Sequence, residues 1–305
     1  MIATVTLNPA IDYTVRLADG LEEGTVARTN DVQYDAGGKG INVSKYLTAL
    51  GSETMASGFV GGLPSSFLAT RLETDGVRTE FVEIDGTTRL NTTILTDDGE
   101  YKINQDGPRV PPEAVDDLLD VLRRREPGAV VVAGSLPGGL TAAAIDRIAA
   151  AGDWKTDVDI DGVLLGELRA NYGVCKPNRS ELAEATGAPV GTVGECLEAA
   201  ALLRDHGFDR VVASLGADGA VMATEERLLH APAIDGPVVD TVGGGDALFA
   251  GFLAAINDGA TDGMALRMGI AAAASVVSVS GTRVPSMSAV RSVADRVELV
   301  ERSSE

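Results

Sequence analysis

From residue 111 onward, short apolar runs alternate with segments of helical length, and this order leaves few folds open to the chain. Residues 129–133 and 210–215 are the clearest apolar runs. Such runs are typical of parallel strands that helices cover on both faces. We therefore predict an α/β protein with a doubly wound, mainly parallel sheet, helices on both faces and an additional small β-sheet lid.

Polar or glycine-rich residues follow several of the predicted strands. They are Gly134 with Ser135, residues 176–178, residues 214–216 and residues 243–246. In a doubly wound sheet, ligands bind at the carboxyl ends of the strands. The shared placement of these segments predicts one composite site.

Three successive glycines, Gly243, Gly244 and Gly245, stand directly before an apolar helical run that continues to Ile256. The first amides of a helix lack intrahelical partners and attract an anion. Asp246 at this helix start is either a capping acid or a base that faces the bound anion. The residues alone leave both readings open.

A second glycine-rich turn leads into a helix near residue 40. Gly37, Gly38 and Gly40 flank Lys39, and Asn42 follows. Lysine is scarce in this chain, so a lysine at a position where backbone amides also converge favours ligand binding over turn chemistry.

Two short regions outside the strand–helix pattern read as β structure. Residues 13–35 and 87–106 are predicted to form the small sheet, which overhangs the body as a lid within a single domain of residues 1–305. Residues 14–33 are expected to form short strands that turn at Gly20 and Gly24.

The small sheet also carries candidate ligands. Asp12 either accepts hydrogen bonds from sugar hydroxyls or caps a turn. Arg89 and Asn91 lie on one strand face by period two. A guanidinium suits a phosphate, because its fork binds two oxygens at once, although an exposed salt-bridge arginine is the competing reading.

Near the C-terminus we expect three further elements. Residues 236–240 read as a turn and a short strand, residues 264–279 as an alanine-rich buried helix, and residues 288–302 as a last helix.

The formal net charge of −20 argues against nucleic acid and against an anionic membrane as partners. Acidic residues are spread along the whole chain, which costs self-repulsion at low salt. At molar salt the Debye length falls to ~3 Å and most of this repulsion disappears. We therefore predict a halophilic protein from a high-salt cytoplasm. The two cysteines suggest no disulfide framework, and no apolar run is long enough for a membrane span.

Residues 37–44 and 240–246 together resemble the signatures of the PfkB (ribokinase-like) family of carbohydrate kinases. The resemblance continues in order along nearly the whole chain, through residues 6–12, 86–89, 134–137, 176–181 and 214–219. The segments at residues 6–9 and 86–89 resemble those of the phosphosugar branch of this family. Most members have alanine where this chain has Gly244, so a slightly looser loop is expected.

The resemblance implies a role for each candidate. Asp246 would be the catalytic base, and the amides of residues 243–245 would form the anion hole for the transferred phosphoryl group. The sugar phosphate would be lined by Asp12, Gly38, Lys39, Asn42, Arg89, Asn91 and Asn104, with Arg28 joining them, in one arrangement from a partner subunit. The ATP side would comprise Lys176, Asn178, Glu181, Ser214, Gly216 and Gly219, with Asn178 and Glu181 organising Mg²⁺ through water. A K⁺ site would use backbone carbonyls at Asp240, Val242, Val276, Val279 and Gly281; the apolar Val279 departs from the polar residue expected there.

The implied reaction is ATP-dependent phosphorylation of fructose 1-phosphate to fructose 1,6-bisphosphate. Fructose 6-phosphate and tagatose 6-phosphate remain alternative substrates, because both ends of the furanose ring carry a CH₂O group. A non-catalytic sugar-phosphate sensor on the same scaffold is the alternative from another class. The exposed edges of the lid favour a homodimer that pairs them.

Overall fold

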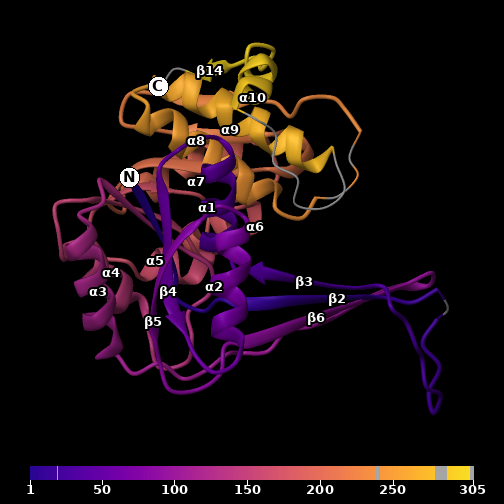
Figure 1. Ribbon diagram of the computed structural model, residues 1–305. Helices are drawn as coiled ribbons and strands as arrows, with labels where there is room; N and C mark the ends of the chain where they lie inside the picture. Colours follow the sequence, from indigo (N-terminus) through magenta and orange to yellow (C-terminus); the bar gives the residue numbers. More distant parts are fainter. Residues whose placement is uncertain (19, 238, 240, 279–286, 303–305) are drawn as a thin grey trace.

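The computed structural model describes residues 1–305 except 19, 238, 240, 279–286 and 303–305 (Figure 1). Its body is a ten-stranded sheet in the order β14-β13-β12-β11-β10-β9-β8-β1-β4-β5. The strands from β5 to β11 in this order run parallel, and β12, β13 and β14 extend one edge antiparallel. The strands are β1 (Ile2–Thr6), β4 (Thr54–Val60), β5 (Arg78–Glu83), β8 (Ala129–Ala133), β9 (Lys155–Asp159), β10 (Tyr172–Cys175), β11 (Phe208–Ser214), β12 (Ala220–Ala223), β13 (Leu228–Ala231) and β14 (Val300–Arg302).

Helices cover both faces of this sheet, and the reason is visible in β8. Consecutive side chains of a strand point to opposite faces. Val130 and Val132 therefore pack into one apolar core, whereas Val131 packs into the other. The first core holds α3 (Ala114–Arg125), α4 (Ala142–Ala150), α5 (Gly162–Glu167), α6 (Arg179–Thr186) and α7 (Val193–Arg204); the second holds α1 (Lys39–Ala49), α8 (Gly244–Asn257), α9 (Asp262–Val277) and α10 (Met287–Ala294). The predicted fold class is confirmed.

A second, four-stranded sheet projects from the body as an arm (Figure 1). Its order is β3 (Val32–Gly37), β2 (Ala10–Arg16), β6 (Arg89–Thr96) and β7 (Gly99–Ile103). Ile11 and Ala36 at its inner end pack with Leu68 of α2 (Pro64–Thr74). The strands of this arm come from the two segments predicted as the lid and from the residues directly beside them.

Two local expectations were wrong, and a third falls partly outside the described residues. Residues 17–31 contain no strand in their described part, because this polar, exposed stretch has no neighbouring strand to pair with along its length. Of the turn and short strand expected over residues 236–240, residues 238 and 240 lie outside the described residues, and residues 236, 237 and 239 carry no strand. The last helix ends at Ala294, and Val300–Arg302 instead pairs with the edge strand β13, whose free backbone groups offset the local preference for helix.

Within the described residues, no helix combines the length and the apolar character needed to cross a membrane.

Candidate active site

The candidate site lies at the carboxyl ends of the parallel strands. Asp159 is the last residue of β9, Lys176 directly follows β10, and Ser214 ends β11. Lys39 and Asp246 reach this edge from the first turns of α1 and α8. Segments far apart in the sequence therefore meet at one place, as the shared position of the strand ends predicts.

Two glycines at the start of α8 are closely packed. Gly243 has φ 79°, and a Cβ there would lie 2.4 Å from the Tyr46 hydroxyl oxygen. At Gly244 a Cβ would lie 2.9 Å from Cγ1 of Val277. An alanine at this position would require a small shift of Val277 or of the helix start.

Asp246 is buried in the first turn of α8, and its Oδ2 accepts a hydrogen bond from Nδ2 of Asn42 at 2.8 Å. Burial, followed by the negative charge of Asp159, raises the pKa of Asp246 to about 6. The Asn42 hydrogen bond and the charges of Lys176 and Lys39 act in the opposite direction. Such a carboxylate is largely ionised at neutral pH and basic enough to accept a proton.

Two lysines share one buried carboxylate beside Asp246. Lys39 Nζ lies 2.8 Å from Oδ1 of Asp159, and Lys176 Nζ lies 3.0 Å from its Oδ2. Lys39 Nζ also lies 3.3 Å from Oε1 of Glu181. Burial lowers the pKa of Lys39, but the charges of Asp159 and Glu181 outweigh it, and the net pKa is raised. The Lys39 side chain is therefore protonated, and so positively charged, at neutral pH.

Arg89 stands on the side of the small sheet. Its guanidinium donates to the backbone oxygens of Asn8, at 3.1 and 3.2 Å, and Gln105, at 3.2 Å. Its Nη2 lies 3.5 Å from Oγ of Ser135, which also accepts a hydrogen bond from Asn8. Because Gly134 approaches the backbone of Lys39, Lys39 and Arg89 border the same turn after β8.

The other candidates for the sugar phosphate are not all gathered here. Asn91 Nδ2 donates to Oδ1 of Asp12 at 2.9 Å, since the two residues are neighbours across β6 and β2. Gly38, with φ 122°, precedes α1 beside Thr6, where a Cβ would lie 2.7 Å from Cγ2 of the threonine. Arg28 and Asn104 are exposed, and no hydrogen bond or ion pair joins either to the cluster in the part of the chain that the structure describes.

A mostly apolar pocket of about 380 Å³ opens next to the start of α8. Three of the predicted nucleotide-side residues line it together with the glycine turn, namely Ser214, Gly216, Gly219, Gly244 and Gly245. Its volume and apolar lining suit a flat heterocycle.

Asn178 and Glu181 form a capping box at the start of α6. Oδ1 of Asn178 accepts from the Glu181 amide at 2.9 Å, and Oε2 of Glu181 accepts from the Asn178 amide at 2.7 Å. Both side chains are thus partly occupied, and the described residues hold no group of three or more His, Cys, Asp or Glu side chains that could cage a metal. This donor set fits Mg²⁺, which keeps several waters and uses one or two carboxylates together with phosphates.

Of the K⁺ candidates, Val276 is buried and Val242 exposed, while Asp240, Val279 and Gly281 lie outside the described residues.

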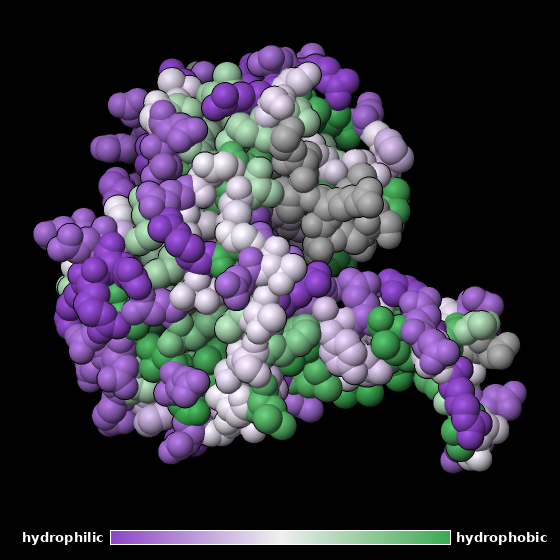
Figure 2. Space-filling view, in the orientation of Figure 1, coloured by the Kyte–Doolittle hydropathy of each residue, from purple (hydrophilic) through white to green (hydrophobic). Residues whose placement is uncertain are grey.

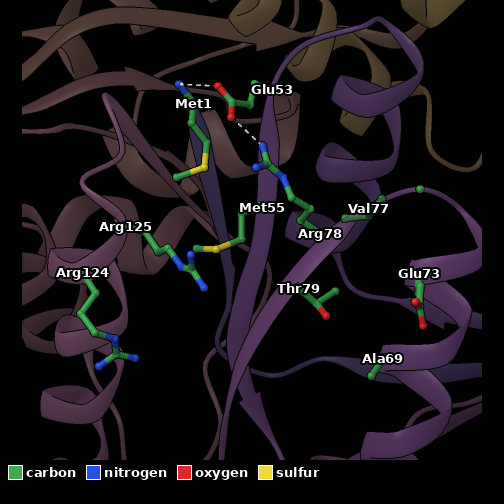
Figure 3. Close-up of a pocket in the computed structure, with 11 residues that line it drawn as sticks. Met1, Glu53, Met55, Ala69, Glu73, Val77, Arg78, Thr79, Arg124 and Arg125 are labelled. Carbon is green, nitrogen blue, oxygen red and sulfur yellow. Dashed lines mark hydrogen bonds and ion pairs between the residues drawn. The ribbon is translucent and has the colours of Figure 1, made fainter.

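A larger hollow, of about 830 Å³, lies at the opposite edge of the sheet (Figure 3). It is lined where β1, β4 and β5 begin, and Arg78 and the Met1 amine pair there with Glu53. The amino ends of the strands are not the ligand edge of a doubly wound sheet. This hollow is therefore separate from the Asp246 cluster.

Sequence reasoning missed two residues of the cluster. Asp159 is fully buried between two lysines, and Asn8 holds Arg89 through its carbonyl oxygen. The signal for Asp159 was an acid that alternates with apolar residues in a strand that must be buried. Asn8 had a weaker signal, its place directly after the first strand.

A buried carboxylate beside the amides of a helix start, with two lysines close by, suits transfer of a phosphoryl group to a hydroxyl. The doubly wound fold and this site together define a phosphotransferase with an alcohol acceptor. The model of the pfkB family of carbohydrate kinases matches residues 5–289, and the chain belongs to this family.

Relatives and solved structures match over nearly the full length. A 1-phosphofructokinase of Haloferax volcanii is 51% identical over 98% of both chains. A D-tagatose-1-phosphate kinase of Bacillus licheniformis is 35% identical over 89% of this chain and 91% of the relative. The crystal structure of a putative phosphofructokinase from Staphylococcus aureus is 32% identical, with a TM-score of 0.85 over 100% of both chains.

Proposed function

We propose that this protein transfers the γ-phosphoryl group of ATP to fructose 1-phosphate and forms fructose 1,6-bisphosphate. The single observation that carries the choice of substrate is the 51% identity with the Haloferax 1-phosphofructokinase over 98% of both chains. The arrangement of Asp246, Lys39 and Arg89 around one strand edge supports the same reaction.

In the proposed mechanism, Asp246 accepts the proton of the sugar O6 hydroxyl as that oxygen attacks the γ-phosphorus, the bond from this phosphorus to the β,γ-bridging oxygen breaks, and ADP leaves. The amides of residues 243–245 bind the oxygens of the transferred group, and Lys39 and Lys176 offset its charge. Arg89 binds the phosphate at the other end of the sugar, with Asp12 and Asn91 on the ring hydroxyls. Bound Mg²⁺, held through water by Asn178 and Glu181, would neutralise charge on the ATP phosphates.

Closely related phosphosugars are the alternatives. Fructose 6-phosphate and tagatose 6-phosphate present a phosphate and a hydroxyl at the same two ends, and the relative named for tagatose 1-phosphate adds a fourth candidate. Comparing kcat/KM of the purified protein for the four sugars tests the proposal. Fructose 1-phosphate is expected to give the highest value, and a higher value for any other sugar would replace it as substrate. No ATP-dependent product with any of them would favour the sensor instead.

We also propose that the protein is halophilic, acts in the cytoplasm and comprises one kinase domain with the small sheet as its lid. The net charge of −20 supports the first point, and the two cysteines, both buried and free, are consistent with the second. The melting temperature is expected to rise from about 0.1 M to about 2 M KCl as acidic side chains are screened. Equal stability at both concentrations would contradict this.

NaCl at the same concentration is the control for that experiment. Because screening depends on ionic strength, NaCl should stabilise the fold about as well as KCl. A K⁺ site near the start of α8 would in addition make activity higher in KCl than in NaCl. Equal activity in both salts would remove the predicted K⁺ site.

We propose that two copies associate through their lids and that Arg28 then reaches the partner's site. Hydrophobic side chains lie along the arm in Figure 2, and Val32, Tyr34, Tyr101 and Ile103 are exposed there. The edge strands β3 and β7 are also open to pairing.

The lid dimer is tested by light scattering after size exclusion in high salt. Wild type is expected to have twice the monomer mass, and Ile103→Glu, which places a charge on β7, is expected to be monomeric. Leu202→Glu is the matched control, because Leu202 is similarly exposed on α7 of the body. A dimer that survives Ile103→Glu but not Leu202→Glu would place the interface elsewhere.

A further inference from the structure

The side chains of Lys39, Lys176 and Asp159 are not equally free to move. The side chain of Lys39 is 36% exposed, whereas that of Lys176 is 4% exposed and that of Asp159 is fully buried. Lys39 is also the first residue of α1, so its flexible stem alone carries the ammonium to the carboxylates. Lys39 is therefore the cation of this cluster that can leave most readily.

Departure of Lys39 would leave one of its two partners better compensated than the other. Asp159 would keep Lys176 on its Oδ2, at 3.0 Å. Glu181 would keep only the hydrogen bond from the Asn178 amide to its Oε2, and its Oε1 would lose a cation at 3.3 Å. Uncompensated charge in a partly buried place is costly, so another cation must replace the ammonium at this point.

The place that Lys39 occupies also suits a divalent cation. The ammonium lies between one oxygen of Asp159 and one oxygen of Glu181, which come from a strand end and a helix. A small hard cation that prefers carboxylate oxygens and retained waters matches this pair of donors. Two cations cannot share the position, because like charges this close repel strongly.

We infer that Lys39 is a replaceable counter-cation, which holds the divalent-metal position between Asp159 and Glu181 until a metal arrives with the nucleotide. This inference rests on the proposed function, since it concerns the metal that accompanies ATP. The exchange leaves the carboxylates neutralised throughout and frees the ammonium for the transferred phosphoryl group. It also keeps the metal position closed to free divalent cations while no nucleotide is bound.

The test measures Mn²⁺ binding to the nucleotide-free protein by electron paramagnetic resonance of the free ion, in molar KCl. Lys39→Met keeps the apolar stem and removes the charge, so its Kd for Mn²⁺ should fall by about tenfold or more relative to wild type. Lys39→Arg keeps the charge and should bind Mn²⁺ as weakly as wild type. Lys155→Met is the matched control, because Lys155 is an exposed lysine at the opposite end of β9.

A double variant locates the gained metal. Glu181→Gln preserves the capping box, since glutamine can make the same backbone contact, but removes the charge. Adding it to Lys39→Met should abolish the gain in Mn²⁺ affinity. The inference is overturned if Lys39→Met binds no more tightly than Lys155→Met, or if the gain survives Glu181→Gln.

These outcomes are separate from the test of the proposed function. If Lys39→Met binds Mn²⁺ more tightly but the wild-type protein phosphorylates none of the four sugars, the inference about Lys39 holds and the proposed function is wrong. If the wild type phosphorylates fructose 1-phosphate but Lys39→Met does not bind Mn²⁺ more tightly, the proposed function holds and the inference about Lys39 is wrong.

Discussion

Replacement of Asp246 by Asn is expected to lower kcat by about 10²–10⁴-fold, the usual contribution of a positioned general base. Asparagine keeps the shape and the place beside Asn42 but cannot take the proton of the attacking hydroxyl. The amides and lysines that hold the phosphates remain, so the KM for ATP should change little. Steady-state kinetics with fructose 1-phosphate and ATP measure both constants.

The pH dependence gives this prediction a second readout. Because burial and Asp159 raise the pKa of Asp246 to about 6, kcat/KM of the wild type should decline as the pH falls below 6. The Asn variant should lose this decline. Asp258→Asn, at the exposed C-terminal end of the same helix, is the control and should keep wild-type kinetics. Near-normal turnover of Asp246→Asn would assign the base to another residue.

Stability distinguishes lost chemistry from lost folding. The native pKa of Asp246 lies above its unfolded value of 3.8, so the native state binds more protons between these two values. Protonation of Asp246 therefore stabilises the native state. This stabilisation is fully present below pH ~4 and is lost as the pH rises through about 6. At neutral pH the charged Asp246 therefore costs stability, and Asp246→Asn should unfold at an equal or higher denaturant concentration than wild type.

Replacement of Arg89 by Gln is expected to raise the KM for fructose 1-phosphate by about 10–100-fold, with a smaller effect on kcat. A charge-assisted hydrogen bond to phosphate contributes about 1.5–3 kcal/mol when the pair is shielded from water. Burial lowers the pKa of Arg89, with Asp12 and Asp106 acting against it, so the guanidinium is already partly removed from solvent. A phosphate that binds Arg89 would therefore displace few water molecules from the guanidinium.

Unphosphorylated fructose separates a phosphate clamp from a structural role. Arg89 also holds the backbone of Asn8 and Gln105, and its loss could loosen the sheet that overhangs the site. If Arg89→Gln impairs fructose and fructose 1-phosphate equally, the residue supports the lid and does not bind phosphate. Arg78→Gln, an exposed arginine at the other edge of the sheet, is the control and should change neither constant.

Much of the fold followed from local patterns, because helices and strands have different periods and glycines mark the turns between them. The run predicted to continue to Ile256 is α8, which ends at Asn257, and the helix predicted at residues 264–279 is α9, Asp262–Val277. The expectation failed for residues 17–31 and for the last helix. In both cases the outcome depended on whether a partner strand stood alongside, which periodicity does not report.

The sequence by itself determined the class of fold and the family, since both follow from the order of strands, helices and glycine turns. It also determined which residues stand at strand ends, because that is a property of each segment alone. Only the tertiary structure decided that Lys39 and Lys176 share Asp159, that Asn42 binds Asp246, and that Gly244 fits beside Val277. These are contacts between segments up to about two hundred residues apart, and the distance between two such side chains is set by how helices pack on the sheet.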